Sequence, residues 1–292
     1  MKLYHYTAIS LGEAIFSSDI SHGHLMHGDG HMTHNVVWLT TDPQPDGHGL
    51  TLGKELLTES QRQHMQRVQH GPLRNSRTLD KTQLRFTVEL NPDQLPGLMS
   101  FISYCENNES ETFAKVYGLS CVIDMKATSD KELKRLMQSA PTKERTWWLS
   151  FRPVMTRALS GVEFNVDGKF EPYDFERHGR EAMRQLGFTY PSPAALSEVA
   201  EIVQPVNAFE RPKAFVFCEN PSKPAKVAIR GGGTERAFEL QTGAPFVGAE
   251  DDRTRPLQDW VRRHRDELEA CSSEAVELYY SYYPERRTST AA

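Results

Sequence analysis

The sequence lacks the patterns that would place it among disulfide-rich, zinc-thiolate or membrane proteins. Its four cysteines lie far apart and form no CxxC pair, which argues against a disulfide framework and a thiolate zinc site. No stretch approaches the roughly 18 apolar residues that span a bilayer. The opening MKLYHYTAIS has no apolar signal-peptide core. We therefore expect a cytoplasmic protein with free thiols and no membrane partner.

An excess of positive charge is also absent. The 292 residues carry a formal net charge of -5 at pH 7, so no general attraction draws the chain to nucleic acid. The stretch from Arg62 to Lys81 is locally basic and is interpreted as a nucleic-acid-facing edge or, more simply, as a solvated helix face followed by loop charges. The hydrophobic fraction of 38% and the charged fraction of 25% are those of an ordinary globular protein.

Apolar periodicity predicts a mixture of strands and helices. Strands are expected at residues 2–7, 36–41, 82–90, 119–125, 145–154, 161–166, 214–218, 225–229 and 236–240. Helices are expected at residues 8–17, 109–117, 130–138, 173–186, 193–203, 254–270 and 273–282. Residues 21–35, rich in glycine and histidine, are expected to form a loop. The pattern changes near Gly168, which divides the chain into a first domain, 1–167, and a second part, 168–292.

Three motifs carry side chains suited to nucleotide chemistry: LYHYT at residues 3–7, VVWLTT at 36–41 and WWLSFRPV at 147–154. Their order resembles that of ADP-ribosyltransferases of the His-Tyr-Glu type, including toxins that modify DNA. They also resemble small bacterial and phage proteins that begin YHYT and continue to VWLT. The resemblance spans roughly residues 1–166. It implies an α+β fold with a split, mostly antiparallel sheet and flanking helices, followed by a C-terminal α/β extension.

The resemblance also implies that the chain uses NAD as its substrate. By position, His5 would bind the ribose and take part in catalysis, while Tyr6 or Trp38 would line the nicotinamide pocket. The residues expected to bind NAD are His5, Tyr6, Thr7, Trp38, Thr40 and Thr41. The chemistry is consistent, because a histidine on a strand can bond a ribose hydroxyl and an aromatic ring can stack on nicotinamide.

Cleavage of the nicotinamide–ribose bond creates an oxocarbenium-like centre, which a nearby carboxylate stabilises. Glu144, directly before the WWLS strand, is the first candidate for this role. Glu163 and Glu89 are the alternatives, since each lies within a predicted strand. None of the three stands in a QxE or ExE pattern, so the identity of the carboxylate stays open.

A second cluster of chemistry-bearing residues is rich in histidine. It contains His22, His24, His27, His31 and His34, with His48 farther along the chain. Imidazoles at such spacing can bind zinc or another transition metal. The interleaved glycines make a preorganised site unfavourable, and no HExxH pattern is present. We therefore expect no catalytic metal and keep these histidines as an alternative site.

The resulting functional hypothesis is an NAD-dependent ADP-ribosyltransferase-like protein, a glycosyl-transferring toxin or an effector in phage–host conflict. Its target would be a nucleic acid or a protein, and a cognate inhibitor or partner protein would accompany it. Two alternatives remain. The first is a non-enzymatic binding or inhibitor protein on the same fold. The second is a metal-dependent hydrolase or nuclease that uses the histidine-rich segment.

Overall fold

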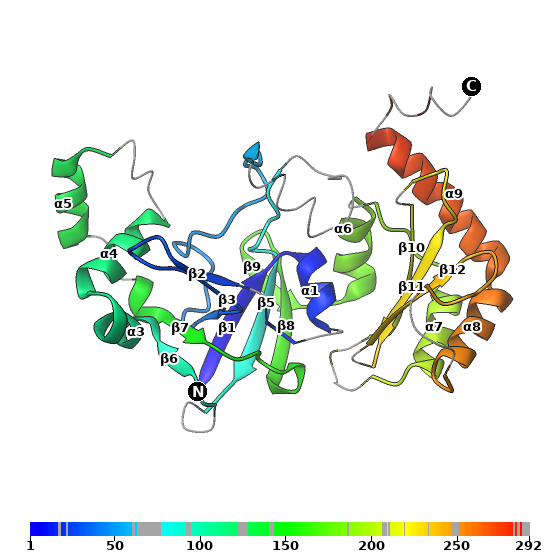
Figure 1. The fold of residues 1–292 in the computed structure, drawn as a ribbon, viewed down its shortest axis with the longest axis horizontal. Helices are drawn as coiled ribbons and strands as arrows, with labels where there is room; N and C mark the ends of the chain where they lie inside the picture. The colour runs from blue at the N-terminus through cyan, green and yellow to red at the C-terminus, as the bar shows by residue number, and fades with distance from the viewer. Residues whose placement is uncertain are drawn as a thin grey trace. The chain divides into compact units, whose positions relative to one another are not determined.

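The computed structural model describes the chain except residues 17–18, 22, 60–61, 63–76, 92–94, 122–127, 140–142, 186, 206–208, 210, 219, 233, 247–250, 283, 285–286 and 288–292. Internal contacts divide the chain into two compact units, whose elements Figure 1 labels. Unit 1 comprises Met1–Ala8, Asp19–Glu55 and Leu79–Tyr173. Unit 2 comprises Ile9–Ser18, Leu56–Thr78 and Asp174–Ala292.

A seven-stranded antiparallel sheet forms the framework of unit 1. In spatial order its strands are β6 (Leu98–Ser100), β7 (Trp147–Ser150), β4 (Val37–Thr40), β1 (Lys2–Thr7), β5 (Leu84–Glu89), β8 (Leu159–Val166) and β9 (Lys169–Pro172). Alternation in β1 and β5 buries Leu3, Leu84 and Phe86 completely, and removal of these side chains from water favours the pairing. The strands predicted at 2–7, 36–41, 82–90, 145–154 and 161–166 are confirmed. The first has the predicted bounds, the last begins two residues earlier, and the other three are shorter.

The helices α3 (Phe101–Asn108) and α4 (Glu111–Ser120) follow β6 in the chain, and α3 contacts β6 and β7 (Figure 1). Both helices begin at a serine cap, because Ser100 and Ser110 each accept a hydrogen bond from the backbone N–H three residues later. Unit 1 also contains α5 (Asp130–Ser139) and the 3-10 helices η1 (Lys143–Thr146) and η2 (Thr156–Ala158). Of the strand predicted at 119–125, Leu119 and Ser120 belong to α4, and residues 122–127 lie outside the described residues.

The predicted loop at residues 21–35 contains a hairpin of β2 (His24–Met26) and β3 (Met32–His34), so the loop prediction is wrong. Leu25 is fully buried, and its burial among the aromatic residues of unit 1 gives this polar segment a hydrophobic anchor. Gly30 adopts a φ of 84° in the connecting turn, a conformation that glycine reaches at little cost.

Unit 2 contains a three-stranded antiparallel sheet in the order β10 (Lys213–Phe217), β11 (Lys226–Gly231) and β12 (Thr234–Glu239). Among its described residues, helices are formed by α1 (Ile9–Phe16), α6 (Arg180–Gln185), α7 (Pro193–Ile202), α8 (Thr254–Arg263) and α9 (Arg265–Tyr282), and Phe175–Gly179 form a π-helical turn. The core lies where α7, α8 and α9 meet the sheet, around the fully buried Trp260 and Leu268. The single helix predicted at 254–270 is interrupted at His264.

The predicted boundary at residues 167 and 168 falls in the turn between β8 and β9, and unit 1 extends to Tyr173. The predicted N-terminal helix is confirmed as α1, but its contacts assign it to unit 2, where it touches α6. The protein is α+β with antiparallel sheets and flanking helices, as expected. Its four cysteines are free thiols. Within the described helices, none is both long and apolar enough to cross a bilayer.

Candidate functional site

Strand register decides which of the predicted site residues share a surface. Residues paired across antiparallel strands point to the same face of a sheet, and successive residues point to opposite faces. Tyr4 pairs with Thr40, and His5 pairs with Phe86. The predicted NAD-binding residues on β1 and β4 therefore fall into two sets, one on each face: His5 and Thr7, and Tyr6, Trp38 and Thr40. We call these surfaces the His5 face and the Trp38 face.

His5 is held in one orientation and one tautomer. Its Nδ1 lies 3.0 Å from the backbone oxygen of Trp38. Because a carbonyl oxygen only accepts, Nδ1 carries the proton and Nε2 carries a lone pair. Burial lowers the pKa of His5, against the opposing effect of the bond to Trp38, and the charge of Lys81 lowers it further. The ring is therefore neutral near pH 7, with Nε2 as a hydrogen-bond acceptor.

Two other side chains belong to the surroundings of His5. Thr7 is buried on the same face, two residues along β1, where it pairs with Leu84 at the start of β5. Lys81 precedes β5 by three residues and is exposed. Its positive charge contributes to the lowered pKa of His5. An imidazole acceptor and a buried hydroxyl group thus lie on one face of β1, and the charge of Lys81 acts on the imidazole.

Tyr6 and Trp38 do not share that surface. The Tyr6 hydroxyl donates to the backbone oxygen of Asp42 at 3.1 Å. The indole of Trp38 stacks on Tyr117 of α4 with ring centroids 5.6 Å apart, and its Nε1–H donates to the backbone oxygen of His24 at 2.9 Å. Both residues are thus part of the packing of the Trp38 face. The expectation that they line a pocket together with His5 is not met.

The threonine pair is divided in the same way. Thr40 is buried, and its hydroxyl donates to Thr146 Oγ1 at 2.9 Å and accepts from the backbone N–H of Asp42 at 3.0 Å. Thr41 is exposed, and its hydroxyl lies 3.5 Å from the backbone oxygen of Thr146. Thr40 therefore fastens the end of β4 to the segment that leads into β7.

Two of the candidate carboxylates lie on β5 and β8. Glu89 is exposed and pairs with Lys2, so it points to the Trp38 face. Glu163 pairs with Arg85 and receives both Nε–H and Nη2–H of its guanidinium, at 2.9 and 2.8 Å. The Arg85 guanidinium also lies 4.0 Å from the ring centroid of Phe170. Neither carboxylate shares the face of His5, and Glu163 is already bound.

Glu144 is the third candidate carboxylate. It lies in η1 and is buried. Its carboxylate packs against Gly118 of α4, where an added Cβ would come within 2.8 Å of Oε2. Because the adjacent Tyr117 stacks on Trp38, α4 covers the Trp38 face. Glu144 is thus held on the side of the sheet opposite to His5.

A partly buried polar cluster on the Trp38 face was not predicted as a site. Lys143 forms an ion pair with Asp42, and His48 Nε2 lies 3.7 Å from Asp42 Oδ2. The indole N–H of Trp147 donates to His48 Nδ1 at 2.7 Å. Nε2 must then carry the proton of the neutral ring, and it is buried without a hydrogen-bond partner in the described structure. Burial, assisted by the charge of Lys143, lowers the pKa of His48.

The pKa of Asp42 is also lowered. Burial acts in the opposite direction, but the hydrogen bond and charge of Lys143 and the backbone N–H of Gln44 outweigh it. The cluster therefore joins a carboxylate, a neutral imidazole and an ammonium group. Local sequence patterns do not predict this cluster, because His48 and Trp147, which are in contact, are 99 positions apart in the sequence.

The histidines of the alternative metal site are dispersed over the hairpin. Both ring nitrogens of His27 are engaged, Nδ1 with Glu109 Oε1 at 3.1 Å and Nε2 with Thr33 Oγ1 at 2.8 Å. His24 and His34 face each other across the strands, His31 is exposed, and His22 lies outside the described residues. In the part of the chain that the structure describes, no group of three or more His, Cys, Asp or Glu side chains could hold a metal ion.

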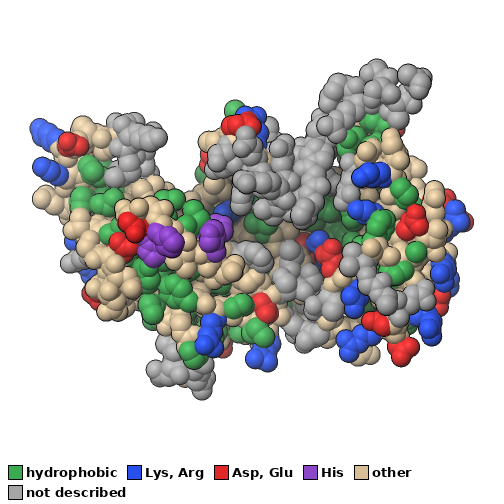
Figure 2. All heavy atoms as spheres, in the orientation of Figure 1, with side chains coloured by type: hydrophobic (Ala, Val, Ile, Leu, Met, Phe, Trp, Pro, Cys, Tyr) green, Lys and Arg blue, Asp and Glu red, His purple; other side chains and the backbone are tan. Residues whose placement is uncertain are grey.

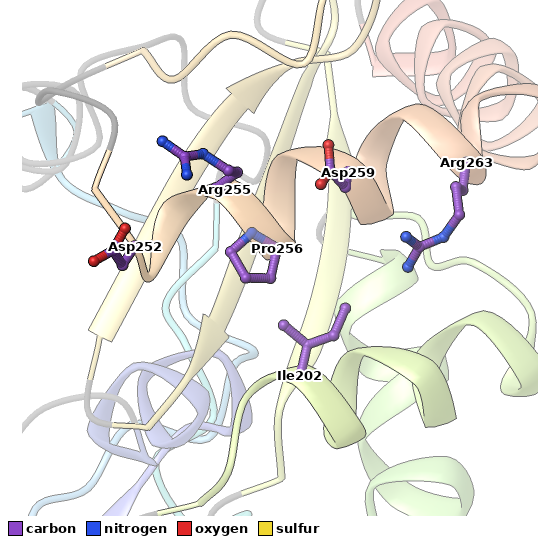
Figure 3. A pocket seen from close by; sticks show the side chains of 6 residues that line it. All are labelled: Ile202, Asp252, Arg255, Pro256, Asp259 and Arg263. Atoms are coloured by element: carbon purple, nitrogen blue, oxygen red, sulfur yellow. The ribbon is translucent and has the colours of Figure 1, made fainter.

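A hollow of about 290 Å³ in unit 2 contains none of the predicted site residues (Figure 3). Its lining residues come from the end of α7 and from α8 with the turn before it: Ile202, Asp252, Arg255, Pro256, Asp259 and Arg263. Two carboxylates and two guanidinium groups give it a mixed polar rim with no catalytic arrangement.

Comparisons of the chain with models of known protein families, with curated proteins and with solved structures gave no match. The geometry of the His5 face and the residue motifs are therefore the basis for assigning a function.

Proposed function

We propose that unit 1 is an ADP-ribosyltransferase-like module that binds NAD through a ribose hydroxyl at His5. The single observation that supports this proposal is the tautomer of His5. Its Nδ1–H is fixed on the backbone oxygen of Trp38, and its Nε2 accepts. A neutral acceptor on a rigid strand favours a ligand group that donates, and a ribose hydroxyl is such a group.

The charge near His5 supports a nucleotide as the ligand. The positive charge of Lys81, close enough to lower the pKa of His5, would attract the pyrophosphate of NAD. Thr7 contributes a hydroxyl group on the same face. The proposed contacts are thus His5 with ribose and Lys81 with phosphate. The residues of the Trp38 face pack on the other side of the sheet and do not contact the ligand.

Transfer of ADP-ribose also needs a carboxylate near the ribose. Glu144 is the carboxylate predicted for this role, but like Glu163 and Glu89 it lies on the face of the sheet opposite to His5. The placement of all three away from His5 favours a second candidate function, an NAD-binding protein without turnover. The geometry of the histidine segment gives no support to a metal-dependent hydrolase.

The experiment measures NAD binding by ligand-observed NMR and nicotinamide release in parallel, on the full chain. Wild type should bind NAD, and His5→Ala should reduce the affinity at least tenfold. His31→Ala is the matched control, because that exposed histidine lies away from the site and should leave binding unchanged. Absence of NAD binding by the folded wild type would refute the proposal.

Nicotinamide release then separates the two candidate functions. Release that requires Glu144, followed with DNA, RNA or protein as acceptor, supports the transferase and identifies its target class. Binding without release under any of these conditions supports the NAD-binding protein. Release that persists in Glu144→Ala would exclude Glu144 as the catalytic carboxylate.

A further inference from the structure

Four exposed side chains share the outer face of the β2–β3 hairpin. His24 pairs with His34, and Met26 pairs with Met32. Paired residues of a hairpin point to the same face, as do residues two positions apart on a strand. Exposure agrees, because all four are exposed while Leu25 between them is buried. Figure 2 shows exposed histidine side chains on the visible surface of unit 1.

The two imidazoles are spaced as metal ligands would be. The Nδ1 atoms of His24 and His34 lie 3.1 Å apart. With metal–nitrogen bonds of about 2.0 Å, that separation corresponds to an N–metal–N angle of about 100°, close to tetrahedral. One shared proton joins the nitrogens when both rings are neutral, since one must donate and the other accept. A metal ion in place of that proton would use the lone pairs of both nitrogens.

The methionine pair determines which metal fits. Thioether sulfur favours a soft ion such as Cu(I), whereas imidazole is compatible with several transition metals. Zinc in proteins is held by thiolate, imidazole and carboxylate ligands. Two imidazoles and two thioethers therefore favour copper over zinc. Met26 and Met32 lie two residue pairs farther along the hairpin than the histidines, about 7 Å along each strand. Their three rotatable bonds allow the sulfur atoms to turn toward the histidine pair.

The hairpin is a firm support for such a site. The buried side chain of Leu25 anchors one strand, and the indole N–H of Trp38 donates to the backbone oxygen of His24 at 2.9 Å. His27, in the turn, is held by Glu109 and Thr33, so its nitrogens do not compete for the ion. His31 lies just before β3, with its ring centroid 5.6 Å from that of His27.

We propose that the outer face of the β2–β3 hairpin binds one Cu(I) ion through His24, His34, Met26 and Met32. The site is separate from the proposed NAD site and does not depend on it. Because all four side chains are exposed, their replacement should leave the fold intact.

The test is an anaerobic titration of the full chain with Cu(I), with ascorbate present and bathocuproine disulfonate as the competing chelator. Wild type should bind one equivalent. His34→Ala and the double variant Met26→Leu/Met32→Leu should each bind at least about tenfold more weakly. His31→Ala should match wild type. Circular dichroism confirms that every variant is folded.

A second readout distinguishes ligation from a general effect on the hairpin. In protein labelled with 13C at the methionine methyl groups, the signals of Met26 and Met32 should shift at one equivalent of Cu(I) and remain in place with Zn²⁺. Unchanged Cu(I) affinity in His34→Ala, or in the double methionine variant, would overturn the proposal. Zn²⁺ binding as tight as Cu(I) binding would overturn it as well.

Discussion

Glu13 and Lys213 are separated by 200 positions in the chain and form an ion pair buried inside unit 2. Both side chains are almost completely shielded from water, and the ring centroid of Phe175 lies 3.8 Å from Lys213 Nζ. Burial lowers the pKa of Lys213, while the charge of Glu13 acts in the opposite direction. The pair links α1, near the start of the chain, to β10, and so explains why the contacts of α1 assign it to unit 2.

Removal of one partner should destabilise unit 2 strongly. Lys213→Met leaves the Glu13 carboxylate buried without its cation, and a loss of about 3–5 kcal/mol in the free energy of unfolding is expected. The double variant Glu13→Leu/Lys213→Met should recover most of that loss, because no charge remains buried. Urea denaturation of the single and double variants measures both effects. A loss below about 1 kcal/mol in the single variant would show that the pair is not buried as described.

The stability of unit 1 should depend on pH through His48. Its pKa is lowered in the folded protein and is close to about 6.5 in the unfolded chain. Between these two values the unfolded state binds more protons, so the free energy of unfolding falls as the pH falls below about 6.5. Protonation of His48 would also put a proton on Nδ1, so that Nδ1 could no longer accept the hydrogen bond from the Trp147 indole N–H.

The variant His48→Gln should reduce this dependence by as much as about 1.4 kcal/mol per pH unit, the contribution of one proton. His5 supplies a remaining slope of the same sign, because its pKa is lowered too. Thermal denaturation between about pH 5.5 and 7.5 measures the slope in each protein, and it avoids the range in which carboxylates titrate. An identical slope in the wild type and in His48→Gln would contradict the buried, neutral His48.

Gly118 tests the position of Glu144. In an exposed helix, Gly→Ala stabilises by about 1 kcal/mol. Here the new methyl group would approach the Glu144 carboxylate, with Oε2 at 2.8 Å. We therefore expect Gly118→Ala to lower the free energy of unfolding by about 1–2 kcal/mol. In a Glu144→Ala background the same substitution should be neutral or stabilising. If Gly118→Ala stabilised the protein in both the wild type and the Glu144→Ala background, the Glu144 carboxylate could not lie against Gly118.

The strands of the sheet could be predicted from the sequence, because apolar alternation in segments such as Leu84–Glu89 reflects burial of one face. The β2–β3 hairpin could not. Its glycines and histidines are typical of a loop, and its stability depends on Leu25 packing against residues distant in sequence, such as Phe101. The main division of the chain was predicted close to its observed place, but the assignment of α1 to unit 2 was not. That assignment involves contacts between residues distant in sequence, such as Glu13 and Lys213.

The site was predicted only in part. His5 and Thr7 are two positions apart and share a face, which strand periodicity implies. The motifs also led to the prediction that Tyr6 binds NAD, although Tyr6 is adjacent to His5 and adjacent residues on a strand point to opposite faces. The cluster of Asp42, His48 and Lys143 required tertiary contacts that local patterns do not contain.

The most direct test of the account concerns the ring of His5. In protein labelled with 15N in histidine, NMR at neutral pH should show His5 neutral, with the proton on Nδ1. Saturating NAD should shift Nε2 as it accepts a hydroxyl group, and free nicotinamide, which has no ribose, should leave it unchanged. A protonated ring, a proton on Nε2, or an Nε2 signal that does not respond to NAD would contradict the proposed site.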